Sequence, residues 1–173
     1  ELARIKKEVD WDGEAGLIGR KVYEMEGPCL LFEKIKDYPP GYRISNGTTG
    51  TWPRVALSMM LPKNTPVRKI YAEYEKRLQT QIPPKIVEKR AAPCKEKIMT
   101  GKDVDLYQFP TPMIHEGDGG RYIGAWDLVV CKDPETGWAN WGMYRFMVHT
   151  RNWLTGWPQS TSQLSFIMKK SYL

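Results

Sequence analysis

Residues 126–145 read WDLVVCKDPETGWANWGMYR, and this stretch decides the fold of the second half of the chain. Every second residue from Trp126 to Val130 is apolar, which is the alternation of a β-strand with one buried face. The segment Asp133–Gly137 (DPETG) is typical of a turn, and it returns the chain into Trp138–His149. The stretch therefore predicts a β-hairpin.

The returning strand carries polar groups that suit a ligand. Asn140 offers a neutral oxygen for a hard divalent cation, and Arg145 offers a permanent charge with a planar fork for a flavin ring or a carboxylate. An odd separation along a straight strand places two side chains on opposite sides, so both could serve one site only if the strand bends, and Gly142 is the expected bend. The alternative is an amphipathic strand with Arg145 in a surface ion pair.

Apolar residues in the first part of the chain recur at helical or strand spacing, and turn residues separate the periodic stretches. The pattern predicts a compact α/β unit. Its expected elements are, in order, a helix over residues 12–25 capped by Asp12, a buried strand Cys29–Phe32, a strand Arg43–Ser45, a helix Val55–Leu61 preceded by Pro53, and a helix after Thr65 with Val67, Ile70, Tyr71, Tyr74 and Leu78 on its apolar face.

A proline-rich segment separates this unit from the rest of the chain. Residues 81–94 contain three prolines and are the best candidate linker. Beyond it come strand-like segments, the glycine-rich loop Glu116–Gly120, and a last segment, Gln163–Tyr172, with apolar residues at helical spacing. The fold class is therefore α+β, with one domain predicted over residues 1–100, linker included, and a second over residues 101–173.

Composition excludes several classes of protein. Apolar residues are 41% and charged residues 27%, as in ordinary globular proteins, and no apolar run approaches the roughly 18 residues that a membrane span needs. The sequence begins at Glu1 without a basic and apolar leader, so a cytoplasmic location is expected. The net charge of +6 is spread among acidic residues, which favours a solvated surface, or else a phosphate-bearing ligand, over a nucleic-acid partner.

The cysteines and histidines do not form a familiar site. Cys29, Cys94 and Cys131 are widely spaced and lack a CxxC pattern, so neither a zinc site nor a disulfide framework is expected. His115 and His149 have no HExxH partner, and each is expected to be structural. The loop after His115 lacks the phosphate-loop pattern, although its glycines would let the backbone approach a ligand closely.

Six motifs follow one another in the order and spacing of the UbiD-type decarboxylases, which the chain resembles over nearly its whole length. They are Pro28–Pro39 (PCLLFEKIKDYP), Pro83–Lys85, Gly101–Leu106, His115–Ile123, Lys132–Gly137 and Asn140–Arg145. The first resembles the family segment PALLFENIKGYP. Each motif is weak alone, and it is their common order that carries the resemblance.

The resemblance implies a fold and a set of cofactors. It implies an N-terminal α/β domain followed by the start of a split β-barrel domain that binds prenylated FMN, a divalent metal (Mn²⁺ or Mg²⁺) and K⁺. In that family's pattern Asn140 would ligate the divalent metal beside the flavin phosphate, and the backbone carbonyl of Trp141 would contact the potassium ion.

Further site residues follow from the same resemblance. The backbone at Gly142, Met143 and Tyr144 would line the cofactor, and Gln163 would contact it. Arg145 would be the catalytic arginine of a Glu-Arg-Glu network, where it would hold the substrate carboxylate and position a glutamic acid.

The sequence departs from the family pattern at two places. Gln163 and Leu164 align with a Gln-His pair whose histidine is a second metal ligand, and leucine cannot coordinate a metal. Either the ligand set differs here or the alignment slips. The family's catalytic glutamates and third metal ligand lie beyond Leu173, so we expect a fragment or a subunit completed by another polypeptide.

The expected function is reversible, non-oxidative decarboxylation of an aromatic carboxylic acid, with CO₂ as the other reactant. The resemblance aligns Ala125 with a position near the cofactor, where a small side chain would leave room for an aromatic ring. Expected partners are a flavin prenyltransferase that supplies the cofactor and further chains in a homo-oligomer or multi-chain complex, with no membrane partner. The alternative is a truncated or accessory subunit that binds flavin or a partner chain without turnover. A split-barrel flavin reductase would need a nicotinamide site, for which the sequence has no signature.

Overall fold

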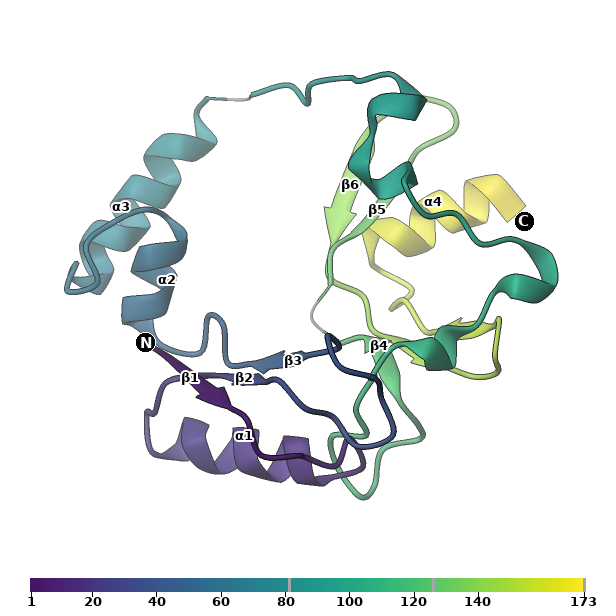
Figure 1. Cartoon of the computed structure of the whole chain (residues 1–173). Coiled ribbons are helices and arrows are strands. Elements are labelled where there is room, and N and C mark those ends of the chain that lie inside the picture. The colour runs from purple at the N-terminus through teal and green to yellow at the C-terminus, as the bar shows by residue number, and fades with distance from the viewer. Residues whose placement is uncertain (81, 126, 173) are drawn as a thin grey trace.

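The computed structural model describes residues 1–80, 82–125 and 127–172, except for the side chain of Tyr172. Figure 1 shows a sheet with a helix at the N-terminal end, two further helices, a long irregular connection, and a second group of strands with a C-terminal helix. We call residues 1–78 the N-terminal part and residues 104–172 the C-terminal part. The predicted boundary at residue 100 stays a prediction.

The N-terminal part is built on a three-stranded sheet of order β1-β2-β3. Strand β1 is parallel to β2, because α1 carries the chain back between them, and β3 is antiparallel to β2. The apolar residues of these elements form one core in which Phe32 is completely buried. The elements are β1 (Leu2–Ile5), α1 (Glu14–Glu24), β2 (Cys29–Phe32) and β3 (Ile44–Asn46).

Helix α1 begins later than the sequence predicts. Its N-cap is Gly13, with φ of 78°, and not Asp12. The reason is that Asp12 is held in an isolated β-bridge with Met113, and the glycine turns the chain from this bridge into the helix. The C-terminal part also approaches the helix closely, because a Cβ at Gly16 would lie 2.2 Å from the carbonyl oxygen of Ile114.

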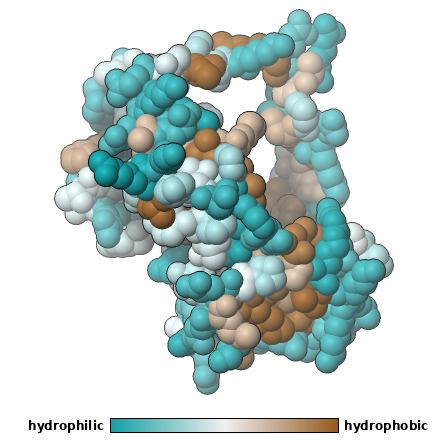
Figure 2. Space-filling model, turned by 90° about the vertical axis from the view of Figure 1, so that its left-hand side faces the viewer, coloured by the Kyte–Doolittle hydropathy of each residue, from teal (hydrophilic) through white to brown (hydrophobic). Residues whose placement is uncertain are grey.

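Helices α2 (Trp52–Ser58) and α3 (Val67–Leu78) confirm two predicted helices, although α2 begins earlier. The predicted apolar face of α3 is mostly not buried: Ile70 is 3% exposed, whereas Tyr71 is 56% and Leu78 is 58% exposed. Pro66, and not Thr65, is the N-cap. Figure 2 views the molecule from this side and shows apolar residues reaching the surface among hydrophilic ones. The periodicity predicted the helix correctly, whereas most of its apolar stripe is exposed.

The connection after α3 is irregular and exposed, as the prolines predict. It contains short 3₁₀ turns and extended chain, and it crosses from α3 to the C-terminal part in Figure 1. The 3₁₀ turns are η1 (Lys89–Ala91), η2 (Pro93–Lys95), η3 (Gly101–Asp103) and η4 (Leu106–Gln108). Gln81 lies outside the described residues.

Two small sheets and a helix make up the C-terminal part. The antiparallel sheet has the order β4-β7-β8, and β5 and β6 form a separate hairpin against which α4 packs. Whether these strands belong to a split β-barrel stays a prediction. The elements are β4 (Tyr122–Gly124), β5 (Val129–Lys132), β6 (Ala139–Gly142), β7 (Phe146–Val148), β8 (Leu154–Gly156) and α4 (Gln163–Tyr172).

The predicted hairpin and the last helix are confirmed. The turn Asp133–Gly137 joins β5 to β6, and Gly137 takes the positive φ of 73° that closes it. The predicted return strand is broken, because β6 ends at Gly142 and the chain joins a different sheet at Phe146. Trp126, at the start of the predicted first strand, lies outside the described residues. In the described part of the chain, no helix is both long and apolar enough to span a membrane.

Candidate functional site

Strand β6 buries Asn140 against the first strand of the hairpin. Asn140 is 6% exposed and lies opposite Cys131 in the register of β5 and β6. Its Nδ2 lies 3.7 Å from Cys131 Sγ and donates to the hydroxyl of Tyr144 at 3.4 Å. Trp141, the next residue, is 63% exposed and pairs with Val130. The alternation of the strand therefore turns the asparagine inward and the tryptophan outward.

The hydroxyl of Tyr144 links Asn140 to the beginning of α4. It accepts a hydrogen bond from the backbone N–H of Leu164 at 3.1 Å, in the first turn of the helix. A Cβ at Gly142 would lie 2.4 Å from the Tyr144 ring, so the ring can fold back only over a glycine. Strand β6 ends at Gly142, where a bend was predicted, and the turn of the chain there brings Tyr144, and not Arg145, beside Asn140.

The backbone N–H groups of the residues after the break have no acceptor among the residues that the structure describes. Among the residues that the structure describes, no hydrogen bond uses the N–H of Met143, Tyr144 or Arg145. Backbone N–H groups are strong donors that a folded protein or its ligand has to satisfy. Three consecutive N–H groups beside a buried asparagine can donate hydrogen bonds to acceptor atoms of a ligand, which suits a phosphate or a flavin ring carbonyl.

Arg145 belongs to a second group. Its guanidinium carbon lies 4.8 Å from the centre of the Tyr122 ring on β4. The side chain is exposed, and the described residues place no carboxylate in an ion pair with it. No hydrogen bond joins Arg145 to Asn140 among the described residues. The structure thus places the two predicted site residues on either side of the same break, with different partners.

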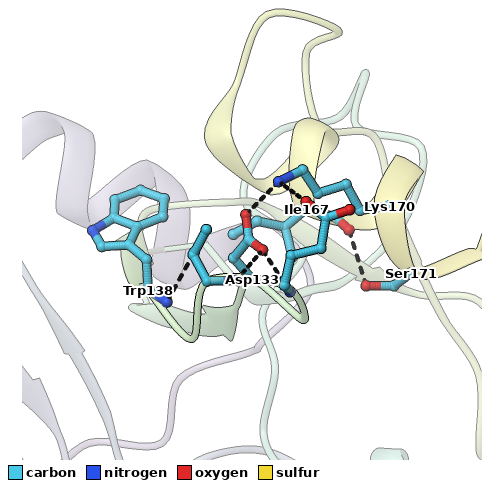
Figure 3. Close-up of polar contacts among 7 residues, drawn as sticks. Asp133, Trp138, Ile167, Lys170 and Ser171 are labelled. Carbon is cyan, nitrogen blue, oxygen red and sulfur yellow. Dashed lines mark hydrogen bonds and ion pairs between the residues drawn. The ribbon is translucent and has the colours of Figure 1, made fainter.

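An ion pair holds the other end of α4 on the hairpin turn, as Figure 3 shows. Lys170 Nζ lies 2.8 Å from Asp133 Oδ2 and 2.9 Å from Glu135 Oε2. Asp133 also accepts hydrogen bonds from the backbone N–H groups of Glu135 and Thr136. The hydrogen bond from Lys170, together with these backbone donors, lowers the pKa of Asp133 to about 2. Helix α4 is therefore fixed at both ends.

The described residues do not complete a metal site. They include no group of three or more His, Cys, Asp or Glu side chains that could hold a metal ion. Leu164, at the position where the resemblance implies a histidine, is 7% exposed, and Ile167, on the same helix, is 5% exposed. Gln163 begins α4 and is exposed. The amide oxygen of Asn140 is the candidate ligand, and it would need donors from elsewhere.

A cleft of about 900 Å³ opens between the two parts of the chain. Its walls come from the end of β3 and the loop after it, and from the segment that leads into and out of β4. Among its lining residues are Asn46, Thr49, Ile114, Tyr122 and Ala125. Ala125 thus faces a cavity, as its small size suggested.

The structure places both histidines at the surface. The His115 side chain is 65% exposed, with Nδ1 at 3.4 Å from Asp118 Oδ2, and His149 is exposed as well. The expectation that they are structural finds support only in this one surface contact. Neither residue takes part in the groups around Asn140 or Arg145.

Sequence reasoning missed three side chains of the site. They are the ring of Tyr122, the hydroxyl of Tyr144, which was expected to contribute only backbone, and the ammonium group of Lys170. The position of Tyr122, two residues after the glycine-rich loop, was a signal, because the glycines of such a loop let a ligand approach the backbone closely. The sequence does not predict the role of Lys170, because its partner Asp133 is distant in sequence and has the pattern of a turn residue.

Two family models match the chain. Residues 1–74 match the 3-octaprenyl-4-hydroxybenzoate carboxy-lyase N-terminal domain, and residues 85–171 match the 3-octaprenyl-4-hydroxybenzoate carboxy-lyase Rift-related domain of the UbiD type. Pyrrole-2-carboxylic acid decarboxylase of Pseudomonas aeruginosa is 34% identical over 98% of this chain and 36% of its own length. Ferulic acid decarboxylase 1 of Candida dubliniensis is 31% identical, over 95% of this chain and 36% of its own length.

Solved structures agree with these relatives. The vanillic acid decarboxylase of Sedimentibacter hydroxybenzoicus, in its closed form, superposes with a TM-score of 0.89 and 32% identity over 98% of this chain and 36% of its own. The UbiD-class enzyme HmfF of Pelotomaculum thermopropionicum, in an evolved dimeric form in complex with prFMN, superposes with a TM-score of 0.84 and 27% identity over 98% of this chain and 38% of its own. The chain spans about a third of the length of these relatives, and with both family models matched along it, the chain belongs to the UbiD family.

Proposed function

We propose that this chain is part of an enzyme that decarboxylates an aromatic carboxylic acid, reversibly and without net oxidation, on prenylated FMN. The observation that carries the proposal is the break after β6, where the buried Asn140 is followed by the backbone N–H groups of Met143, Tyr144 and Arg145, for which the described residues provide no acceptor. The named activities of the relatives and the prFMN in one related structure support it. We extend the proposal to a cytoplasmic, multi-chain protein that receives its cofactor from a flavin prenyltransferase.

The residues of the chain divide the work. When bound, the prenylated flavin would supply an electron sink for the carbon that loses CO₂. The free N–H groups after Gly142 would bind and orient the flavin, and Gln163 would contact it from the start of α4. Arg145, which has a permanent charge and no carboxylate partner among the described residues, would bind the substrate carboxylate through its planar fork.

The donors on this chain fit a metal only in part. Asn140 could supply one oxygen to Mn²⁺ or Mg²⁺, and the carbonyl of Trp141 could supply one to K⁺, but Leu164 cannot coordinate. Any such ion would therefore need ligands from the flavin phosphate or from polypeptide outside the described residues. The role that we assign to Asn140 without a metal is to hold Tyr144, and so the backbone donors, in place.

The test is to co-express the protein with a flavin prenyltransferase and to measure bound flavin and turnover separately. Native mass spectrometry would report the flavin, and exchange of ¹³CO₂ into an aromatic acid would report the reaction. We expect prenylated FMN to be bound, and we expect Arg145→Gln to lower kcat/KM by about 100-fold or more while the flavin stays bound, because a charged donor to the reacting group is lost. Arg43→Gln, at another exposed arginine, is the matched control.

A second pair of variants tests the cofactor contacts. Asn140→Ala should weaken flavin binding, because Tyr144 and the backbone beside it lose a partner, whereas Asn152→Ala, at an exposed asparagine, should leave binding unchanged. Retention of full flavin binding and full turnover in both Asn140→Ala and Arg145→Gln would overturn the proposal.

The second candidate function is an accessory chain that binds flavin or a partner without turnover. The buried Leu164 and the lack of an acidic or histidine cluster in the described residues favour it. Flavin binding that depends on Asn140, together with no exchange of ¹³CO₂ into any aromatic acid by the complete protein, would support this function and exclude the first.

A further inference from the structure

The structure assigns Arg121 and Tyr122 as positioning residues for Arg145, which they connect to the N-terminal part of the chain. Arg121 fixes the beginning of β4 against the N-terminal part, and Tyr122, the next residue, holds the Arg145 guanidinium over its ring. The N-terminal part thereby helps to position Arg145. The effect of this position on substrate binding rests on the function proposed above.

Arg121 is held on many sides without a carboxylate among its described partners. Its Nε donates to the carbonyl of Thr111 at 2.6 Å, and its terminal nitrogen donates to the carbonyl of Phe109 at 3.1 Å and to the hydroxyl of Tyr38. Its guanidinium carbon lies 4.1 Å from the centre of the Trp11 ring. The planar guanidinium stacks and donates in several fixed directions at once, so these contacts hold Arg121 rigidly. A lysine could not make the same set of contacts.

The contacts of Arg121 connect the two parts of the chain. Trp11 and Tyr38 pack against the core of the N-terminal part, and the Tyr38 hydroxyl also donates to the carbonyl of Tyr107 at 2.9 Å. The carbonyl of Arg121 accepts from the N–H of Val148 at 2.7 Å, which extends the pairing of β4 with β7. The position of β4 is therefore fixed by the N-terminal part on one side and by β7 on the other.

The ring of Tyr122 links the fixed strand β4 to the side chain of Arg145. Successive residues of an extended chain point to opposite faces, so the side chains of Arg121 and Tyr122 have different surroundings. The Tyr122 ring lies 4.8 Å from the guanidinium carbon of Arg145, and it also lines the cleft between the two parts. Arg145 is exposed in a segment outside the strands, and its stacking on Tyr122 is the interaction with the described residues that restricts its directions.

The experiment uses the flavin-free protein and the NMR signal of the Arg145 Nε–Hε group, which the variant Arg145→Lys assigns by its loss. We expect the Hε signal upfield of an exposed arginine such as Arg43, because the Tyr122 ring faces it. Tyr122→Phe keeps the ring and should keep the shift, whereas Tyr122→Leu should remove it. Arg121→Lys should move the signal toward its position in Tyr122→Leu, since β4 loses the Arg121 contacts that fix it to the N-terminal part.

Turnover gives a second, separate measurement. Tyr122→Leu should raise KM for the aromatic acid by about twofold to fivefold, the range of an exposed cation–π contact, with kcat affected less, and Tyr122→Phe should restore KM. An Arg145 signal that is the same in the unmodified protein and in Tyr122→Leu would overturn the inference. A shifted signal that responds to Tyr122 and Arg121 in a protein without turnover would uphold the positioning and refute only the proposed reaction.

Discussion

The two parts of the chain are stabilised in different ways. In the N-terminal part the strands and α1 close over a core in which Phe32 is 0% and Val9 is 2% exposed. Both parts expose large apolar side chains, but the described residues of the C-terminal part include fewer buried ones, Val148, Leu164 and Ile167, and its elements are also held by individual hydrogen bonds and ion pairs. Burial stabilises the first part, and a few named contacts fix the geometry of the second.

The difference explains why the candidate site lies where it does. A ligand needs free donors, an accessible cation and room, and a sealed core offers none of these. The C-terminal part offers the free N–H groups after Gly142 and the exposed Arg145. Because few contacts hold these groups, removing one hydrogen bond or stacking contact should change the geometry of the site more than it changes the free energy of unfolding.

The strongest test of this comparison is Phe32→Ala. Removing a fully buried aromatic side chain leaves a cavity in the N-terminal core, and we expect the free energy of unfolding to fall by about 3–5 kcal/mol. Urea denaturation would measure the loss. The matched control is Phe166→Ala on α4, where the side chain is 56% exposed and the loss should be much smaller. Equal losses would show that the two parts do not differ in burial.

The next largest effect is expected for Tyr144→Phe. The change removes the hydroxyl that accepts from the Leu164 N–H and from Asn140, at a cost of about 1 kcal/mol. Faster hydrogen exchange at the Leu164 amide would locate the effect at the start of α4. Tyr42→Phe is the control, because its hydroxyl makes no hydrogen bond with the other described residues. An unchanged Leu164 amide would show that the hydroxyl does not hold the helix.

The elements follow from the sequence better than the contacts between them. Periodicity located α3 and α4, and the DPETG turn located the hairpin, because such signals are local. The burial of α3 could not be derived, since which face a helix buries depends on what packs against it. The partners of Arg145 and Asp133 are also tertiary contacts between segments far apart in the chain, and no local pattern encodes Tyr122 or Lys170 as those partners.

A pH titration tests the tie between Asp133 and Lys170. The pKa of Asp133 is lowered from 3.8 to about 2 in the folded protein, so the carboxylate contributes stability above pH 3.8, and that contribution is lost as the pH falls toward 2. Lys170→Met removes the main cause of the shift, so the stabilisation should be smaller and should disappear at higher pH. Hydrogen exchange in α4 between pH 4 and 2 would follow it, with Lys169→Met as control. Identical acid profiles for the two variants would contradict the assignment of this tie.

The smallest effect is expected where the two parts are alike, at apolar side chains that are almost fully exposed. Trp157→Ala in the C-terminal part and Met60→Ala in the N-terminal part remove side chains that are 92% and 93% exposed. Neither should change the free energy of unfolding by more than about 0.5 kcal/mol, because neither leaves a cavity. Denaturation at several protein concentrations would check this. A larger, concentration-dependent loss of the free energy of unfolding for Trp157→Ala alone would mean that another chain covers the C-terminal surface in solution. The contrast in burial between the two parts would then hold for the single chain and not for the assembly.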